Sequence, residues 1–78
     1  MSIETAKRLV SVNAVSRVAI ECFDGRRWAI VLRGREDFIL RSARQDPKAY
    51  AKIETALAEV RSLGLRFAEV EFSKWQRE

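Results

Sequence analysis

The sequence predicts a small α+β domain, a two-layer sandwich in which a long helix covers one face of a four-stranded, mostly antiparallel sheet. Two patterns indicate this class. Apolar residues recur at every second position in four short stretches, and at helical spacing in two others. The chain has 78 residues, enough for one core, so residues 1–78 are expected to form a single domain. The expected order of elements is α-β-β-β-α-β.

The first helix is expected over residues 3–12. Ser2 can cap its N-terminus, and Glu4 lies in the first turn, where the helix dipole favours an anion. Asn13 is a suitable residue to end the helix. Apolar residues at helical spacing predict one buried side, formed by Ile3, Ala6, Leu9 and Val10.

Strands are expected over residues 15–23, 27–33, 38–43 and 66–73. Even-numbered residues in these strands are apolar and share one face, because side chains alternate along a strand. Gly34 and the charged residues after it predict the turn between the second and third strands. The expected apolar face of the sheet comprises Val18, Ile20, Cys22, Trp28, Ile30, Leu32, Phe38, Leu40, Val70 and Phe72.

The pair Asp46-Pro47 predicts the start of the long helix. Aspartate is a good cap, and proline at the first helical position loses no hydrogen bond. Gly64 is expected to cap the C-terminus of the helix. Because this helix crosses between them, the third and fourth strands are expected to be parallel. The helical side expected to cover the sheet comprises Tyr50, Ile53, Leu57 and Val60.

The hairpin between the first two strands contains Asp24-Gly25, a strong signal for a two-residue turn. A two-residue loop would pair Cys22 with Arg27 and place the two apolar rows on opposite faces. Pairing Cys22 with Trp28 instead keeps six apolar residues together. Their burial outweighs a turn preference of about 1 kcal/mol. We therefore expect a loop of three or five residues, or a bulge.

The opposite face of the expected sheet combines charged residues with an apolar strip. Such a strip calls for a cover, either the first helix or a partner surface. A homodimer is one expected partner arrangement, since pairing would also stabilise so short a chain. The residues expected at this protein interface are Ala19, Ala29, Val31, Ile39 and Phe67.

The net charge is +4, and the whole excess lies between Arg26 and Lys48, where seven basic residues meet three acidic ones. The simplest interpretation is a solvated basic surface. The alternative is a salt-sensitive contact with the DNA backbone or an acidic partner. In that case Arg44 and Lys48 would form a phosphate site with the N-terminus of the long helix. The expected contact residues are Arg26, Arg27, Arg41, Arg44 and Lys48.

The sequence predicts no enzyme, cofactor or metal site. Histidine is absent, and the single cysteine, Cys22, falls on the apolar strand face. The carboxylate pairs Glu36-Asp37 and Glu69/Glu71 fall at a turn and on an exposed strand face, where solubilising charges are usual. One cysteine, no long apolar run and no signal-peptide pattern predict a cytoplasmic protein without membrane contact.

Short motifs over most of the chain match one known family: Leu9-Val10, the strand "RRWAIVLRG", Leu40 with Ala43-Arg44, Tyr50, Ile53-Glu-Thr-Ala, Leu63-Gly64-Leu65 and Glu69-Val70. In these motifs the chain resembles the ParC-type accessory proteins encoded beside plasmid partition genes. The resemblance implies a role in plasmid maintenance through contacts with partition proteins or DNA, and it carries over no binding residue. In that family's pattern the long helix starts nearer Ile53, and residues 48–50 extend a strand.

Two functions follow from these patterns. The first is a non-enzymatic accessory protein of a plasmid or other mobile element that binds the DNA backbone or a partition-type protein. The second is a protein-interaction module or homodimer, such as a mobile-element inhibitor of a host defence complex.

Overall fold

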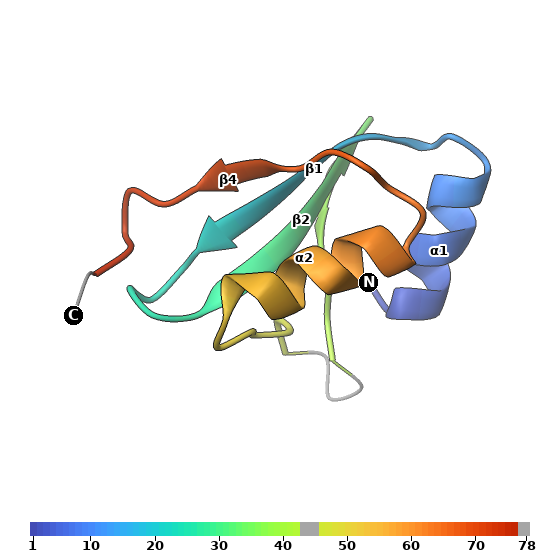
Figure 1. Ribbon diagram of the computed structural model, residues 1–78. Coiled ribbons are helices and arrows are strands. Elements are labelled where there is room, and N and C mark those ends of the chain that lie inside the picture. The colour runs from blue at the N-terminus through green and yellow to red at the C-terminus, as the bar shows by residue number, and fades with distance from the viewer. Residues whose placement is uncertain (43–45, 77–78) are drawn as a thin grey trace.

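A computed structural model describes residues 1–42 and 46–76, and within them the six expected elements occur in the expected order. The strands form one sheet in the order β3-β2-β1-β4, antiparallel except for the parallel pair β1–β4 (Figure 1). The predicted α+β class with a four-stranded sheet is confirmed. The elements are α1 (Ile3–Ser11), β1 (Val15–Cys22), β2 (Trp28–Gly34), β3 (Asp37–Ile39), α2 (Ile53–Ser62) and β4 (Glu69–Glu71).

Helix α1 forms where the sequence predicts it. The Ser2 hydroxyl accepts a hydrogen bond from the Thr5 N–H at 3.2 Å, which caps the helix. The chain leaves the helix at Asn13 with φ +58°, a left-handed conformation that asparagine tolerates. Ala6 is fully buried in the same core cluster as α2, so both helices pack on one side of the sheet. The expectation that α1 could cover the opposite face is therefore wrong.

Strands β1 and β2 pair in the register that the apolar rows predict. The Phe23 N–H donates to the Arg27 carbonyl at 3.2 Å, so Asp24-Gly25-Arg26 form a three-residue hairpin loop. The predicted odd-length loop is confirmed. The facing pairs are Val18–Leu32, Ile20–Ile30 and Cys22–Trp28.

The core lies between the two helices and the centre of the sheet. Helix α2 contacts β1 and β2, and the edge strands extend beyond its cover. For this reason three residues expected on the buried face, Phe38, Val70 and Phe72, are exposed, as is Leu57 on α2. The buried residues are Ala6, Val18, Ala19, Ile20, Cys22, Trp28, Ala29, Ile30, Leu32, Leu40, Tyr50, Ala56, Val60 and Leu63.

The predicted helix start at Asp46-Pro47 is wrong, because α2 begins at Ile53. The preceding segment pairs with the sheet instead: Tyr50 and Trp28 exchange two backbone hydrogen bonds of 2.9 Å, and Pro47 forms a bridge with Arg41. These bonds and the burial of the Tyr50 ring outweigh a capping preference of about 1 kcal/mol. The alternative that residues 48–50 extend a strand agrees with this pairing.

Strands β3 and β4 are shorter than predicted and lie at opposite edges of the sheet. They run in the same direction, as the pairings through β2 and β1 require, but they do not touch as neighbours. The predicted third strand reached Ala43, which lies outside the described residues. Gly64 adopts φ +94° after α2, in agreement with the predicted glycine cap.

Candidate functional site

The residues that the sequence suggests for DNA or an acidic partner lie in two different segments of the structure. Arg26 and Arg27 belong to the hairpin loop between β1 and β2, whereas Arg41 and Lys48 lie in the segments that follow β3 and precede α2. Arg44 lies outside the described residues. The described cations of this set therefore come from two parts of the chain, the hairpin loop and the segment between β3 and α2.

Two of these cations are held by carboxylates. The Arg27 Nε donates to Asp24 Oδ2 at 2.5 Å, and the guanidinium lies 5.2 Å from the centre of the Phe23 ring. The Lys48 Nζ lies 3.1 Å from Glu59 Oε1, in the second half of α2. Lys48 is therefore away from the helix N-terminus where the sequence suggested a phosphate site.

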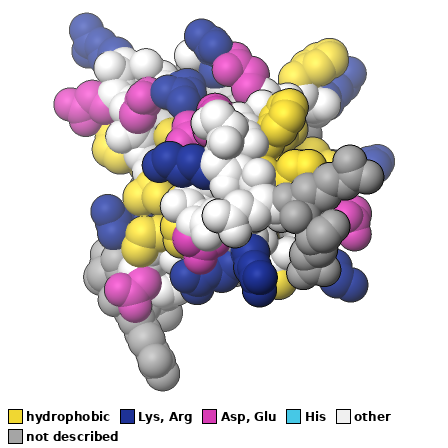
Figure 2. All heavy atoms as spheres, turned by 90° about the vertical axis from the view of Figure 1, so that its left-hand side faces the viewer, with side chains coloured by type: hydrophobic (Ala, Val, Ile, Leu, Met, Phe, Trp, Pro, Cys, Tyr) yellow, Lys and Arg dark blue, Asp and Glu magenta, His cyan; other side chains and the backbone are white. Residues whose placement is uncertain are grey.

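The charges at the hairpin end of the molecule are mixed in sign. Figure 2 shows Lys and Arg side chains spread around this end, with Asp and Glu side chains between them and hydrophobic side chains exposed beside them. Strong binding to the DNA backbone depends on several cations that neutralise adjacent phosphates. The described part of this face offers alternating charges and apolar surface instead.

The protein interface suggested by the sequence lies mainly on the sheet face turned away from the helices. Ala19 and Ala29 are only 2% and 1% exposed in the single chain, so they offer almost no area to a partner. Val31 and Ile39 are half-buried. Phe67 is 86% exposed, and it lies before β4.

Ion pairs cross this open face. Arg33 reaches across from β2 to Glu21 on β1 at 2.7 Å, and it also pairs with Asp37 at 2.8 Å. On this face the residue pair Ala19–Val31 lies between Arg33 and Glu21. Arg17 pairs with Glu69 at the β4 side of the same face. Long charged side chains thus cross the face for which the sequence predicts a helix or a partner as cover.

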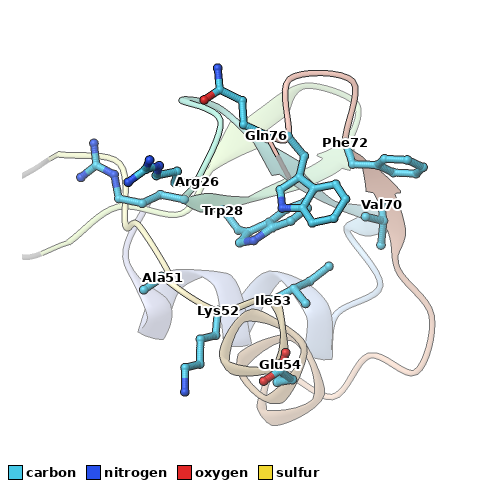
Figure 3. Close-up of a pocket in the computed structure, with 11 residues that line it drawn as sticks. Arg26, Trp28, Ala51, Lys52, Ile53, Glu54, Val70, Phe72 and Gln76 are labelled. Carbon is cyan, nitrogen blue, oxygen red and sulfur yellow. The ribbon is translucent and has the colours of Figure 1, made fainter. Parts of the chain in front are cut away.

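A cleft of about 860 Å³ lies between the β1–β2 hairpin, the start of α2 and the end of β4 (Figure 3). We call it the cleft. Trp28 lies across from Ile53 in the close-up, whereas Arg26 and Lys52 point outward at its rim. The apolar side chains that line the cleft are Trp28, Ala51, Ile53, Val70, Phe72 and Trp75.

The segment after β4 completes the cleft by docking on the hairpin. The Gln76 N–H donates to the Gly25 carbonyl at 2.8 Å, and the Trp75 N–H donates to the Phe72 carbonyl at 3.0 Å. Gly25 has φ +88°, and a Cβ there would lie 3.0 Å from Gln76 Cδ. Glycine at this position therefore serves both the turn and the close approach of the C-terminal segment.

Exposed apolar side chains concentrate at the cleft and beside it. Phe72 is 60% exposed and Val70 is 40% exposed. An adjoining hollow of about 510 Å³ is lined by Leu57 and Phe67, among others, and Leu57 is 45% exposed. Extended exposed apolar surface on a small protein marks an interaction site. Sequence reasoning missed this site because it assigned Val70, Phe72 and Leu57 to the core.

Two carboxylates near the cleft stay ionised at neutral pH. Hydrogen bonds from the backbone and side chain of Arg27, with a smaller contribution from the Arg26 N–H, hold the pKa of Asp24 below its usual value. Hydrogen bonds from Ser73 likewise lower the pKa of Glu71. The ionised Asp24 carboxylate therefore accepts the hydrogen bonds that hold the hairpin loop together. Glu71 carries a negative charge on β4.

Side chains that could ligate a metal are dispersed in the part of the chain that the structure describes. Within residues 1–42 and 46–76, no three His, Cys, Asp or Glu side chains gather to hold a metal ion. Cys22 is free and buried. Neither described helix has the length and apolar character needed to cross a bilayer.

Comparison with known proteins identifies no relative: no family model, curated protein or solved structure matches the chain. The resemblance to ParC-type accessory proteins stays a prediction.

Proposed function

We propose that the protein is a non-enzymatic interaction module that binds an apolar segment of a partner protein in the cleft. The observation that carries this proposal is the exposure of Val70, Phe72 and Trp75 around one concave surface, while the apolar residues at the centre of the sheet are buried. Aromatic side chains in a concave site supply large contact areas and are frequent anchors of protein interfaces.

Contact with a protein is favoured over contact with DNA. Arg27 and Lys48 are held in ion pairs with Asp24 and Glu59, so binding phosphate would compete with these contacts. Trp28 is 6% exposed and belongs to the core, so it has little face on which a base could stack. A protein-binding module also fits the accessory role that the ParC-type resemblance implies, with a protein partner in place of DNA.

A display experiment tests this proposal. A phage library of random dodecapeptides is selected on the immobilised protein, and a selected peptide that lacks tryptophan is synthesised. Both tryptophans of the chain line the cleft, so intrinsic fluorescence reports its occupancy directly. We expect a saturable fluorescence change, and at least about tenfold weaker binding by Phe72→Ser, a residue lining the cleft.

Phe38→Ser is the matched control, because Phe38 is an exposed phenylalanine on the edge strand at the other side of the sheet. This variant should bind the selected peptide as the wild type does. A selection that yields no peptide, or a peptide that binds Phe72→Ser as tightly as the wild type, contradicts the proposal. If a labelled DNA duplex instead binds at about 50 mM salt, where phosphate contacts are strongest, a nucleic-acid function replaces it.

A further inference from the structure

Strand β4 forms an edge of the sheet. It pairs with β1 on one side, and in the described part of the chain no strand pairs with its other side. The outward N–H and C=O groups of an edge strand are a template for a further strand. The sequence Glu69-Val70-Glu71 contains neither proline nor lysine, so the features that restrict pairing at this edge are its shortness and its two glutamates.

An apolar groove runs beside this edge, between β4 and α2. Val70 and Phe72 line it with Ile53 at the start of α2, and Figure 3 shows Val70 and Ile53 on opposite sides of the cleft. Further along α2, Leu57 lines the adjoining hollow together with Phe67. A free strand edge beside a helix is a general arrangement for binding extended peptides, because backbone bonds add a strand while alternate side chains enter pockets.

Charge argues against a second copy of the chain at this edge. Two-fold pairing of β4 with itself is antiparallel, and a pairing centred on Val70 sets Glu69 opposite Glu71 of the second copy. A pairing centred on either glutamate sets that residue opposite itself. Like charges directly opposite each other destabilise a strand pair. The same two carboxylates favour a partner strand that carries basic residues.

Glu71 attracts a basic residue of the partner more strongly than Glu69 does. Glu69 is already paired with Arg17, whereas Glu71 accepts a hydrogen bond from the Ser73 N–H at 3.1 Å. Within the described residues Glu71 forms no ion pair. An incoming cation opposite Glu71 would therefore not have to displace an arginine.

We propose that β4 extends its sheet by pairing with an extended segment of a partner protein in which apolar residues alternate with lysine or arginine. The apolar residues of the segment enter the groove beside Val70 and Phe72, and the basic residues lie on the other face of the sheet opposite Glu71 and Glu69. This inference rests on the proposed function, and it adds the mode of binding and the charge of the partner.

The probe is a synthetic nonapeptide that alternates lysine with valine, acetylated and amidated at its ends. We expect it to slow hydrogen exchange of backbone amides in residues 69–71, measured by NMR on the full chain. A matched peptide with glutamate in place of lysine should bind about tenfold more weakly. The variant Glu71→Lys should reduce or reverse the preference for the lysine peptide over the glutamate peptide. Circular dichroism would confirm that the variant is folded.

A third peptide, N-methylated at alternate residues, keeps the side chains but removes the backbone donors of one edge. Loss of its binding supports strand addition. Equal binding of the N-methylated peptide, without slower exchange in β4, overturns strand addition while leaving peptide binding in the cleft intact. Protected β4 amides in a dimer detected by light scattering without peptide would show a second copy at this edge and overturn the inference. Failure of the proposed function differs from both, since then the display library yields no cleft-binding peptide.

Discussion

Replacing Phe72 by serine is expected to change stability little, although phenylalanine is among the largest apolar side chains. Complete burial of such a side chain contributes about 1.5–3 kcal/mol. Phe72 is 60% exposed, so only the remaining part of its surface is removed from water. The expected loss in the free energy of unfolding is therefore about 1 kcal/mol or less. By contrast Ile20, with 0% exposure, lies in the core, and Ile20→Ala should cost about 2–5 kcal/mol.

Urea unfolding followed by circular dichroism measures both losses. Each variant can be compared with the wild type only if its free energy of unfolding falls with urea concentration at the same slope. A changed slope indicates an altered unfolded or native state. A loss of about 3 kcal/mol or more for Phe72→Ser would show that this side chain is part of the core. The interpretation of the cleft as exposed binding surface would then be refuted.

Three further predictions concern the fold around the site. Gly34→Ala should lower stability by about 1–3 kcal/mol in urea unfolding, because its Cβ would overlap the Ala14 carbonyl oxygen; an unchanged midpoint would contradict this packing. Asp24→Ala should lower the thermal midpoint at pH 7. Because the folded-state pKa of Asp24 is lowered, its stabilisation is present above about pH 4 and is lost as pH falls through the folded pKa. The difference from the wild type should therefore shrink at acid pH, and a difference independent of pH would contradict the assignment. Cys22 should react with a thiol reagent only when the protein unfolds, since it is 2% exposed; rapid reaction of the native protein would show that this strand face is open.

The hairpin shows what can be predicted from sequence. The turn signal Asp24-Gly25 alone favours a two-residue loop, but the apolar rows of β1 and β2 fix the register and require an odd loop. The structure has the three-residue loop Asp24-Gly25-Arg26, in which the Asp24 carboxylate accepts the N–H groups of Arg26 and Arg27 at 3.1 and 2.7 Å. The alternation of apolar residues along β1 and β2 is visible in the sequence. It excludes the two-residue loop, because that loop would place the two apolar rows on opposite faces.

The helix start and the edge strands could not be predicted in the same way. Asp46-Pro47 has the local properties of a helix start, yet Pro47 and the residues after it pair with Trp28 and with residues 40–41 after β3, which only the fold brings near. Similarly, Val70 and Phe72 alternate as buried strand residues do, and their exposure follows from α2 being too short and too central to cover β4. Non-local contacts, which sequence spacing does not reveal, decide both outcomes.

The candidate site depends on the same non-local contacts. Arg26 and Arg27 were predicted as contact residues from charge alone, and they lie at the rim of the cleft. The apolar lining was not predicted, because it joins a hairpin, a helix start and a C-terminal segment that are far apart in sequence. The position of Trp75 beside the hairpin follows from the backbone bond between Gln76 and Gly25, for which the sequence holds no signal.

Binding of a partner segment at the cleft and the β4 edge is the central proposal. Titration of isotope-labelled protein with a display-selected peptide, followed by backbone amide NMR, tests that claim most directly. We predict that the largest shift changes fall in residues 25–28, 51–54 and 69–76. Changes confined instead to the opposite edge of the sheet around Arg33 and Asp37, or to the surroundings of Arg41 and Lys48, would contradict it.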